Sequence, residues 1–277
     1  MGWTATSDVE EFWHATRHYL RTHRVPSTVV LSIVDTLRTS GPGGYSGPPE
    51  LAWCDEGEGV SAVIVRTPPH RPVVSAMTTA AAARWAADRP APDRLLGPPE
   101  AVAALASAWG VSTEVLVPER LHRLDVLRAP ADPSPTRLAG DADRDLLWAW
   151  LEEFHHEATP DDPLPPRGPV DAAVDESRVV VAVSGGEPVA YASASPIMLG
   201  TARIGPVYTR PAHRRRGHGA AVTAALAALL ADRGAEEILL FTDLDNATSN
   251  ALYARLGFVG VVDVVDAALV PVARKNV

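Results

Sequence analysis

The chain has 277 residues, of which 46% are hydrophobic, and its formal net charge is −9. This length and apolar fraction allow one large domain or two modest domains with a real core. The acidic balance argues against a nucleic-acid partner, since non-specific binding to phosphates needs a basic face. The single cysteine, Cys54, excludes an internal disulfide and a cysteine-based zinc site, and we expect it to be buried.

No stretch approaches the roughly 18 uninterrupted apolar residues of a membrane helix. The first residues lack a basic segment followed by an apolar one, so we expect no secretion signal. These observations favour a cytoplasmic protein with no membrane partner. No pattern in the sequence specifies an oligomeric state.

The first half is expected to alternate helices and strands. Asp8 or Ser7 can cap the first helix, and a glycine-containing turn at residues 56–59 suits a hairpin. The predicted elements are helices over residues 8–23 and 27–37, strands over 51–54, 60–66 and 73–77, helices over 79–88 and 100–109, and strands over 113–117 and 121–127.

Repeated prolines between residues 128 and 135 predict a stiff, extended linker. We therefore expect a first domain over residues 1–128, a linker over 129–135 and a second domain over 136–277. The elements predicted in the second domain are a helix from Asp141 or Asp143 through His155, a proline-rich loop over 159–169, a hairpin over 179–183 and 188–194, a strand over 203–209, a helix over 220–233, a strand over 238–242, a helix over 246–256, and strands over 258–264 and 267–272.

Residues 204–219 and the helix after them carry the most informative pattern. An apolar strand leads into a loop of arginines and glycines, and residues 220–233 then favour a helix. Gly234 stands where a left-handed helix cap is expected. The core-facing stripe of this helix is predicted to be Val222, Leu226, Leu229 and Leu230.

The loop suits an anion. The first amides of a helix have no internal partners and lie at the positive end of its dipole. Gly217 and Gly219 remove side chains that would keep a phosphate away, and arginines 214–216 add charge. The glycine spacing fits neither the dinucleotide fingerprint nor the P-loop. The alternative is an ordinary tight turn with solvated arginines.

Arg214-x-x-Gly217-x-Gly219 resembles the acyl-CoA pyrophosphate loop of the GNAT N-acetyltransferases. Residues 246–258, with the sequence NATSNALYARLGF, look like a second motif of that family. The resemblance covers about residues 136–277. It implies a mixed central sheet flanked by helices, an α/β fold of the acyl-CoA N-acyltransferase type.

The resemblance implies acetyl-CoA as co-substrate. The backbone of Val207 and Thr209 would pair with the pantetheine amides, and the amides from Arg215 to Ala220 would hold the pyrophosphate. The cofactor-binding residues that it implies are Val207, Thr209, Arg214, Arg215, Arg216, Gly217, His218, Gly219, Ala220, Asn246, Ser249 and Asn250. Asn246 has a second interpretation as the N-cap of its helix.

Tyr253 is the predicted catalytic acid. When an amine attacks a thioester, the departing thiolate needs a proton, and a phenol with a pKa of about 10 is still protonated at neutral pH. The alternative is a half-buried helix tyrosine whose hydroxyl binds water.

The general base is less constrained. Many GNAT enzymes carry a glutamate on the cofactor strand, where this chain has Gly205 and Pro206. Asp243, at the carboxyl end of the next strand, is our candidate. The alternatives are Glu153, His155, His156 and Glu157 of the first helix of this domain, or proton loss through ordered water.

The first half has the order of elements that the second half shows. At the place of the cofactor loop, however, residues 77–82 contain neither glycine nor arginine. We interpret this half as a degenerate GNAT-like copy without catalytic function, so that the fold occurs in tandem.

The predicted function is transfer of an acetyl group from acetyl-CoA to a primary amine of a small molecule. The alternatives are an acyl-CoA-binding sensor without turnover and a protein N-acetyltransferase. No metal is expected, since the adjacent His155 and His156 project about 100° apart on a helix. The acidic residues that would favour a cationic amine are Glu152, Glu153, Glu157, Asp161 and Asp162, while an uncharged amino acid or an amino sugar would fit nearly as well.

Overall fold

The computed structural model describes residues 2–43, 45–160 and 162–272, so Asp161 lies outside the described residues. The chain forms two compact units. The first unit contains the chain up to Leu121, the short segment Asp243–Asp245 and the C-terminal strand from Val262. The second unit contains His122–Thr242 and Asn246–Val261. These units follow contacts in space, and the sequence boundaries at residues 128 and 136 stay a proposal.

The two halves of the chain repeat one order of elements. The first half contains β1 (Gly2–Thr6), α1 (Val9–Thr22), α2 (Thr28–Ser40), β2 (Glu50–Asp55), β3 (Val60–Arg66), β4 (Val73–Val74), α3 (Thr79–Ala86), β5 (Arg94–Gly97), α4 (Pro99–Trp109) and β6 (Val111–Leu124). The second contains β7 (Thr136–Leu138), η1 (Asp141–Asp143), α5 (Arg144–Ala158), α6 (Gly168–Asp175), β8 (Val179–Ser184), β9 (Glu187–Ala194), β10 (Thr201–Thr209), η2 (Pro211–His213), α7 (His218–Asp232), β11 (Glu237–Asp243), α8 (Ala247–Leu256) and β12 (Phe258–Pro271).

The strands of each unit follow the same order. In the sheet of the first unit the strand order is β1, β2, β3, β4 and β5, and β12 lies next to β5. In the second unit the order is β7, β8, β9, β10 and β11. The pairs are antiparallel except for β4 with β5 and β10 with β11, which are parallel. The expected tandem arrangement of a mixed sheet with flanking helices is confirmed.

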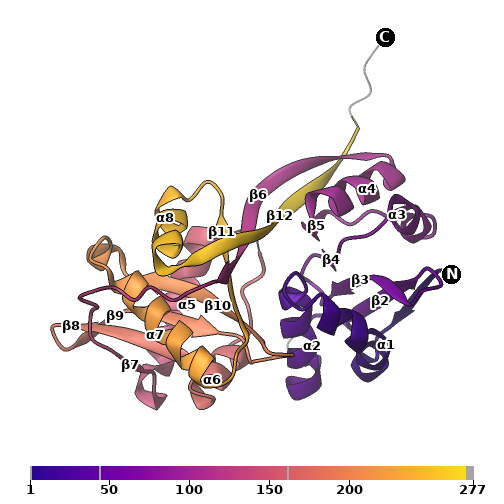
Figure 1. Cartoon of the computed structure of the whole chain (residues 1–277). Coiled ribbons are helices and arrows are strands. Elements are labelled where there is room, and N and C mark those ends of the chain that lie inside the picture. The colour runs from indigo at the N-terminus through magenta and orange to yellow at the C-terminus, as the bar shows by residue number, and fades with distance from the viewer. Residues whose placement is uncertain (1, 44, 161, 273–277) are drawn as a thin grey trace, which may run out of the picture. The chain divides into compact units, whose positions relative to one another are not determined.

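Helices cover both faces of the sheet in the second unit (Figure 1). Successive residues of a strand point to opposite faces. On β8, Val179 and Val181 pack in a cluster with α5 and α6, whereas Val180 and Ala182 join a cluster with α7 and α8. Strand β10, whose Ile204 joins the α7 cluster and whose Tyr208 joins the α5 cluster, likewise lies between two separate layers of core.

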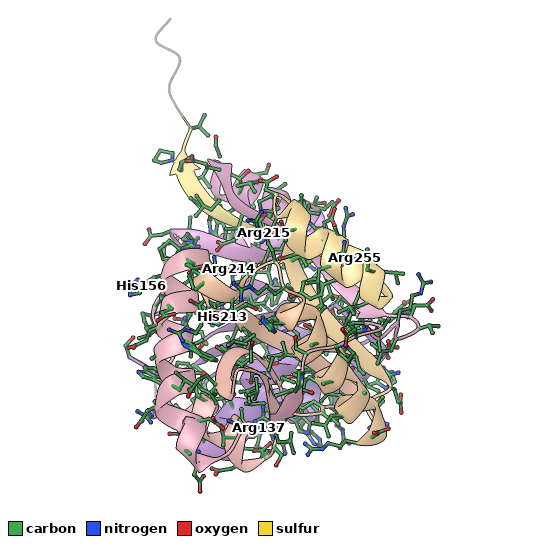
Figure 2. All side chains as sticks on the ribbon, turned by 90° about the vertical axis from the view of Figure 1, so that its left-hand side faces the viewer. Arg137, His156, His213, Arg214, Arg215 and Arg255 are labelled. Carbon is green, nitrogen blue, oxygen red and sulfur yellow. The ribbon has the colours of Figure 1, made fainter. Side chains whose placement is uncertain are left out.

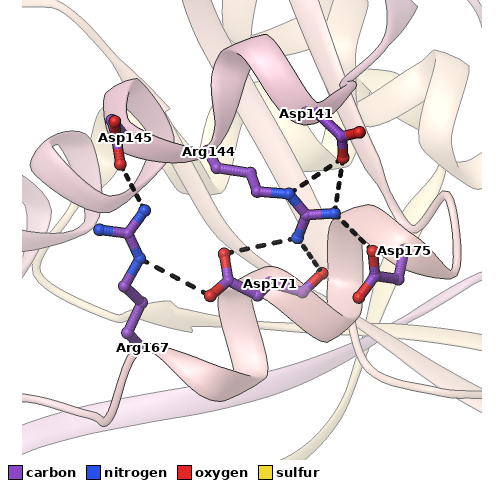
Figure 3. Close-up of polar contacts among 6 residues, drawn as sticks. All are labelled: Asp141, Arg144, Asp145, Arg167, Asp171 and Asp175. Atoms are coloured by element: carbon purple, nitrogen blue, oxygen red, sulfur yellow. Dashed lines mark hydrogen bonds and ion pairs between the residues drawn. The ribbon is translucent and has the colours of Figure 1, made fainter.

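Ion pairs join α5 to α6 (Figure 3). The Arg144 guanidinium contacts Asp141 at 2.8 Å, Asp171 at 3.4 Å and also Asp175. These carboxylates raise the pKa of Arg144 above its ordinary value, Asp141 most of all. Arg167, just before α6, contacts Asp145 and Asp171. The network ties α6, and the end of the proline-rich connection at Arg167, to the first turn of α5.

Several predicted elements need correction. The two strands expected over 113–117 and 121–127 form one strand, β6, and those expected over 258–264 and 267–272 form one strand, β12. The strand expected over 73–77 is limited to Val73–Val74. Four short elements were not predicted, namely β1, β5, β7 and α6. The four short elements have too few residues to show a periodic pattern of apolar positions. The strands β6 and β12 continue through the charged residues at which the sequence suggested a break.

Other expectations are confirmed. Asp8 caps α1 by accepting the amides of Glu10 and Glu11, and the hairpins β2–β3 and β8–β9 form. Cys54 is fully buried. Within the described ranges, no helix combines the length and apolarity needed to cross a membrane.

The predicted core-facing stripe of α7 can be tested by the effect of its leucines on the stability of the protein. Leu226 is fully buried, whereas Leu229 is only partly buried. Because a cavity adds to the lost transfer free energy, we expect Leu226→Ala to lower the free energy of unfolding by about 2–5 kcal/mol. Leu229→Ala is the matched control and should cost clearly less in urea unfolding. Equal losses would contradict the assigned orientation of α7.

Candidate functional site

The candidate site is built around a separation of two parallel strands. β10 and β11 pair from Thr201 with Glu237 to Ile204 with Leu240, and no later pair of these strands is found among their described residues. Beyond that point β10 continues to pair with β9, with Val207 opposite Ala192. The residues of β10 after Ile204 thus keep one partner strand and leave the other.

A β-bulge marks the point of separation. Between Ile204 and Val207 the register of β10 shifts by one residue against β9. The extra residue falls at Gly205 and Pro206, and proline has no amide hydrogen for the ladder. A bulge bends its strand, so Gly205 and Pro206 direct β10 away from β11.

The loop after β10 ends at a helix with open amides. Gly217 is the N-cap of α7 and has a left-handed conformation, with φ +84°. The first internal helical bond runs from Ala221 N to Gly217 O at 3.0 Å. The amides of His218, Gly219 and Ala220 therefore have no intrahelical acceptor, and no side chain in the described part of the chain caps them.

The equivalent helix of the first unit is closed to an anion. Thr78 caps α3 through a bond from Ala81 N to its Oγ1, at 3.0 Å. The same hydroxyl donates to Glu56, whose carboxylate is also paired with Arg84. A capping hydroxyl and a carboxylate thus occupy the place that stays open at α7, which agrees with a degenerate first half.

The three arginines of the loop have different surroundings. Arg214 pairs with Glu157 of α5 at 2.6 Å and donates from Nε to the Thr209 carbonyl at 2.9 Å. Arg215 and Arg216 are exposed, and no ion pair to either is found within the described ranges. Figure 2 shows His213, Arg214 and Arg215 on the face that also carries His156 and Arg255.

His218 begins α7 and is buried. Its Nδ1 lies 2.8 Å from the Ser134 hydroxyl, in the proline-rich segment before β7. Burial lowers the pKa of His218, and repulsion by His213 and Arg216 lowers it further. These effects favour a neutral imidazole beside the open amides.

The polar residues of α8 serve the helix and the neighbouring strand. Asn246 is the N-cap, and its Oδ1 accepts the Ser249 amide at 3.0 Å. Asn250 accepts a bond from the Thr242 hydroxyl at 2.6 Å, and Thr242 in turn lies 3.0 Å from Nε2 of His122. The capping interpretation of Asn246 is confirmed, while a contact of Ser249 or Asn250 with a ligand stays a prediction.

Gly257 ends α8 for a steric reason. Its φ is +97°, and a Cβ at this position would lie 1.9 Å from the Val126 carbonyl oxygen. Only glycine fits this left-handed cap against a passing backbone. The glycine of the second motif is therefore required by packing.

Tyr253 is a core residue of the second unit. It is 8% exposed and meets Phe258 edge to face, with ring centroids 6.0 Å apart. Burial raises the pKa of Tyr253 to about 12. The phenol therefore holds its proton at neutral pH, as a proton donor must.

The candidate bases lie in different places. Asp243 ends β11 and accepts the Asp245 amide at 2.8 Å. Glu153 accepts the hydroxyl of Tyr208 at 2.6 Å, and Glu157 binds Arg214. His155 is buried with its Nδ1 3.0 Å from the Thr159 hydroxyl, whereas His156 is exposed.

Tyr208 contacts two residues of the candidate site, Glu153 and Arg214, and the sequence analysis did not include it among the site residues. It alternates with Val207 and Thr209 on β10 and faces the α5 side of the sheet, next to Trp150. Burial raises the pKa of Tyr208 to about 12, and the Glu153 carboxylate contributes to the rise. The alternation along β10 was the available signal, because it puts Tyr208 on the face opposite α7.

A parallel strand pair that separates, followed by a glycine loop and an uncapped helix, is an arrangement within this α/β fold whose open amides suit an anion such as phosphate. Residues 144–258 match the model of the acetyltransferase (GNAT) family. This segment, which contains both motifs, is thus a GNAT-family domain, and the family supports acyl transfer, for which it generally uses acetyl-CoA.

Solved structures similar to this chain have the same fold. A Drosophila protein is 16% identical with a TM-score of 0.62, covering 97% of this chain and 98% of its own. A GNAT-family acetyltransferase from Colwellia psychrerythraea is 10% identical with a TM-score of 0.61, covering 97% and 100%. A tandem GNAT protein from the clavulanic acid biosynthesis pathway, without AcCoA, is 15% identical with a TM-score of 0.57, covering 96% and 98%. Curated protein sequences give no match.

The two loop glycines should respond differently to alanine. A Cβ at Gly217 meets no other described atom within 4 Å, so the cost arises from its left-handed backbone and should be about 1–2 kcal/mol. At Gly219 a Cβ would make ordinary contacts with Thr209 and Leu252, at 3.6 and 3.7 Å. Thermal unfolding should show a larger loss for Gly217→Ala than for Gly219→Ala, and the reverse order would contradict the loop geometry.

Tyr253 should make stability depend on alkaline pH. Its folded pKa of about 12 exceeds the ordinary value of about 10, so the folded state keeps the proton longer than the unfolded state. This contribution is complete below pH 10 and is lost as the pH rises toward 12. Urea unfolding between pH 9 and 11 should show a shallower loss for Tyr253→Phe, by at most about 1.4 kcal/mol per pH unit. Equal slopes for wild type and variant would contradict the assignment.

Proposed function

We propose that the second unit transfers an acetyl group from acetyl-CoA to a primary amine of a small molecule. The observation that carries this proposal is the uncapped start of α7, located directly after the strand that leaves its parallel neighbour. The proposal assigns Arg215, Arg216 and the amides from Gly217 to Ala220 to the pyrophosphate.

The residues fit the co-substrate chemically. The bare Gly217 leaves room at the helix start, and α3 of the first unit supplies a contrast in which a threonine and a glutamate close the same place. The backbone groups of Val207 and Thr209 lie on the part of β10 that has left β11, and we assign them to the amides of the pantetheine arm.

Acetyl-CoA supplies an activated acyl group as a thioester. In the proposed reaction the amine nitrogen forms a bond to the carbonyl carbon and the carbon–sulfur bond breaks. Tyr253 gives its hydroxyl proton to the departing sulfur, and the proton that the amine nitrogen loses passes to the base and from there returns to the tyrosinate. A phenol pKa of about 12 keeps the donor protonated before each turnover.

The proton of the amine needs an acceptor, for which we retain Asp243 as the proposed base. Glu153 is the strongest alternative, because its carboxylate is exposed and oriented by Tyr208. Much of the rate would come from positioning, since holding the amine beside the thioester replaces a bimolecular encounter.

The acidic residues of α5 support a cationic amine as acceptor. Glu152, Glu153 and Glu157 lie on the last turns of α5, ahead of the proline-rich connection to α6. We propose a small-molecule partner in a cytoplasmic setting and neither a nucleic acid nor a membrane, in agreement with the net charge of −9.

A sensor that binds acyl-CoA without turnover is the second candidate. The replacement of the strand glutamate by Gly205 and Pro206 favours it, while the buried, protonated Tyr253 favours the enzyme. Calorimetry with CoA followed by thiol release from acetyl-CoA over a panel of amines separates the two. Binding with amine-dependent thiol release supports the enzyme, binding without release for every amine supports the sensor, and peptides as the only acceptors would indicate a protein acetyltransferase.

Tyr253→Phe tests the acid. We expect kcat to fall by about 10²–10⁴-fold, the usual contribution of general acid catalysis, while the Kd for CoA stays within about twofold. Tyr191→Phe is the matched control, because Tyr191 is another buried tyrosine of the second unit but packs on the opposite face of the sheet. An equal fall of kcat in both variants, or a loss of CoA binding in step with kcat, would reject the acid role.

A further inference from the structure

We propose that Arg214, the first residue of the glycine-loop motif, is a positioning residue that ties the loop to α5 through Glu157, and that it does not hold phosphate itself. This inference rests on the proposed binding of CoA at the loop. It differs from the prediction from the sequence, in which Arg214, Arg215 and Arg216 all bind the cofactor.

The guanidinium of Arg214 already binds other residues of the protein. Its Nη2 donates to both carboxylate oxygens of Glu157, at 2.8 and 2.6 Å, and its Nε donates to the Thr209 carbonyl at 2.9 Å. The guanidinium also lies over the ring of Tyr208, 5.7 Å from its centroid. One side chain thus holds together the end of β10, the loop and the last turn of α5.

A second contact supports the same junction one helical turn earlier. Glu153 and Glu157 are four residues apart on α5 and so lie on one face of the helix. Glu153 accepts the Tyr208 hydroxyl at 2.6 Å, while Glu157 accepts Arg214. The acidic face of α5 is therefore directed at β10 and at the loop that follows it.

Arg214 differs from its two neighbours in charge as well as in contacts. The Glu157 carboxylate neutralises its charge at hydrogen-bond distance, which weakens its attraction for another anion. Arg215 and Arg216 are exposed, and the described residues supply neither with an ion pair. The phosphate-directed charge of the loop is accordingly assigned to Arg215 and Arg216.

The junction has a consequence for affinity. The left-handed Gly217 and the amides after it must be held in place before a ligand arrives, because ordering the loop on binding would cost affinity. The Arg214–Glu157 pair holds the segment three residues upstream of Gly217. Loss of either partner should then weaken CoA binding by the same mechanism, although Glu157 carries a negative charge that could only repel phosphate.

The test is a double-mutant cycle measured by calorimetry with CoA. We expect Arg214→Gln and Glu157→Gln each to weaken binding by about two- to fivefold, the range of an exposed ion pair, and the double variant to be no weaker than the singles. Arg215→Gln is the matched control in the same loop. It should weaken binding by about tenfold or more, as loss of a charged hydrogen bond does, and its effect should add to that of Glu157→Gln.

A charge exchange gives the rescue. Arg214→Glu alone should weaken binding strongly, and the combination with Glu157→Arg should restore most of the affinity by rebuilding the pair in reverse. Amide hydrogen exchange without ligand should show residues 210–217 opening faster to a similar degree in Arg214→Gln and Glu157→Gln.

Three results overturn the inference. Tighter or unchanged CoA binding in Glu157→Gln together with a strong loss in Arg214→Gln would show that Arg214 contacts the phosphates. Additive losses in the cycle, or no rescue by the charge exchange, would show that the pair does not act as a unit. No binding of CoA by the wild type would overturn both this inference and the proposed function, whereas the other two results leave the proposed function in place.

Discussion

The candidate site depends on the separation of two parallel strands, β10 and β11, whose main chains are paired only over the first part of β10. After Ile204, β10 continues beside β9 and no longer pairs with β11, and a bulge at Gly205 and Pro206 marks the change. Backbone groups that leave a sheet need other partners, since unsatisfied amides and carbonyls are costly when buried. In the proposed complex, the amides of the pantetheine arm would meet that need. The same strand leads directly into the glycine loop, so the separated strand and the candidate anion site are continuous in the chain.

The two halves of the chain show how few changes distinguish an open site from a closed one. Both halves place a helix after the fourth strand of their order. In the first half Thr78 caps that helix and Glu56 lies against the cap, which satisfies the Ala81 amide and adds a negative charge. In the second half Gly217 leaves the amides open. The contrast supports the proposal that the first half keeps the fold without an anion site.

The sequence predicted the local structure well where a residue type is suited to one particular backbone position. Gly217 and Gly257 have positive φ, Asp8 and Asn246 cap helices, and the apolar residues of α7 recur at helical spacing. Short elements such as β5 and α6 carry too few residues for a period, and β6 and β12 continue through charged positions. The contacts of Arg214 could not be predicted from the sequence for another reason. Its partner Glu157 lies 57 residues earlier, and no local pattern connects them.

The central claim is that the first amides of α7 bind the pyrophosphate of CoA. The most direct measurement is an NMR titration of the amide resonances of Gly217, His218, Gly219 and Ala220 with CoA. The account predicts large, saturable shifts at these four amides, and little change at the amides of Thr79 to Ala81 in the first unit. Saturable binding of CoA that leaves the four resonances unmoved would contradict it.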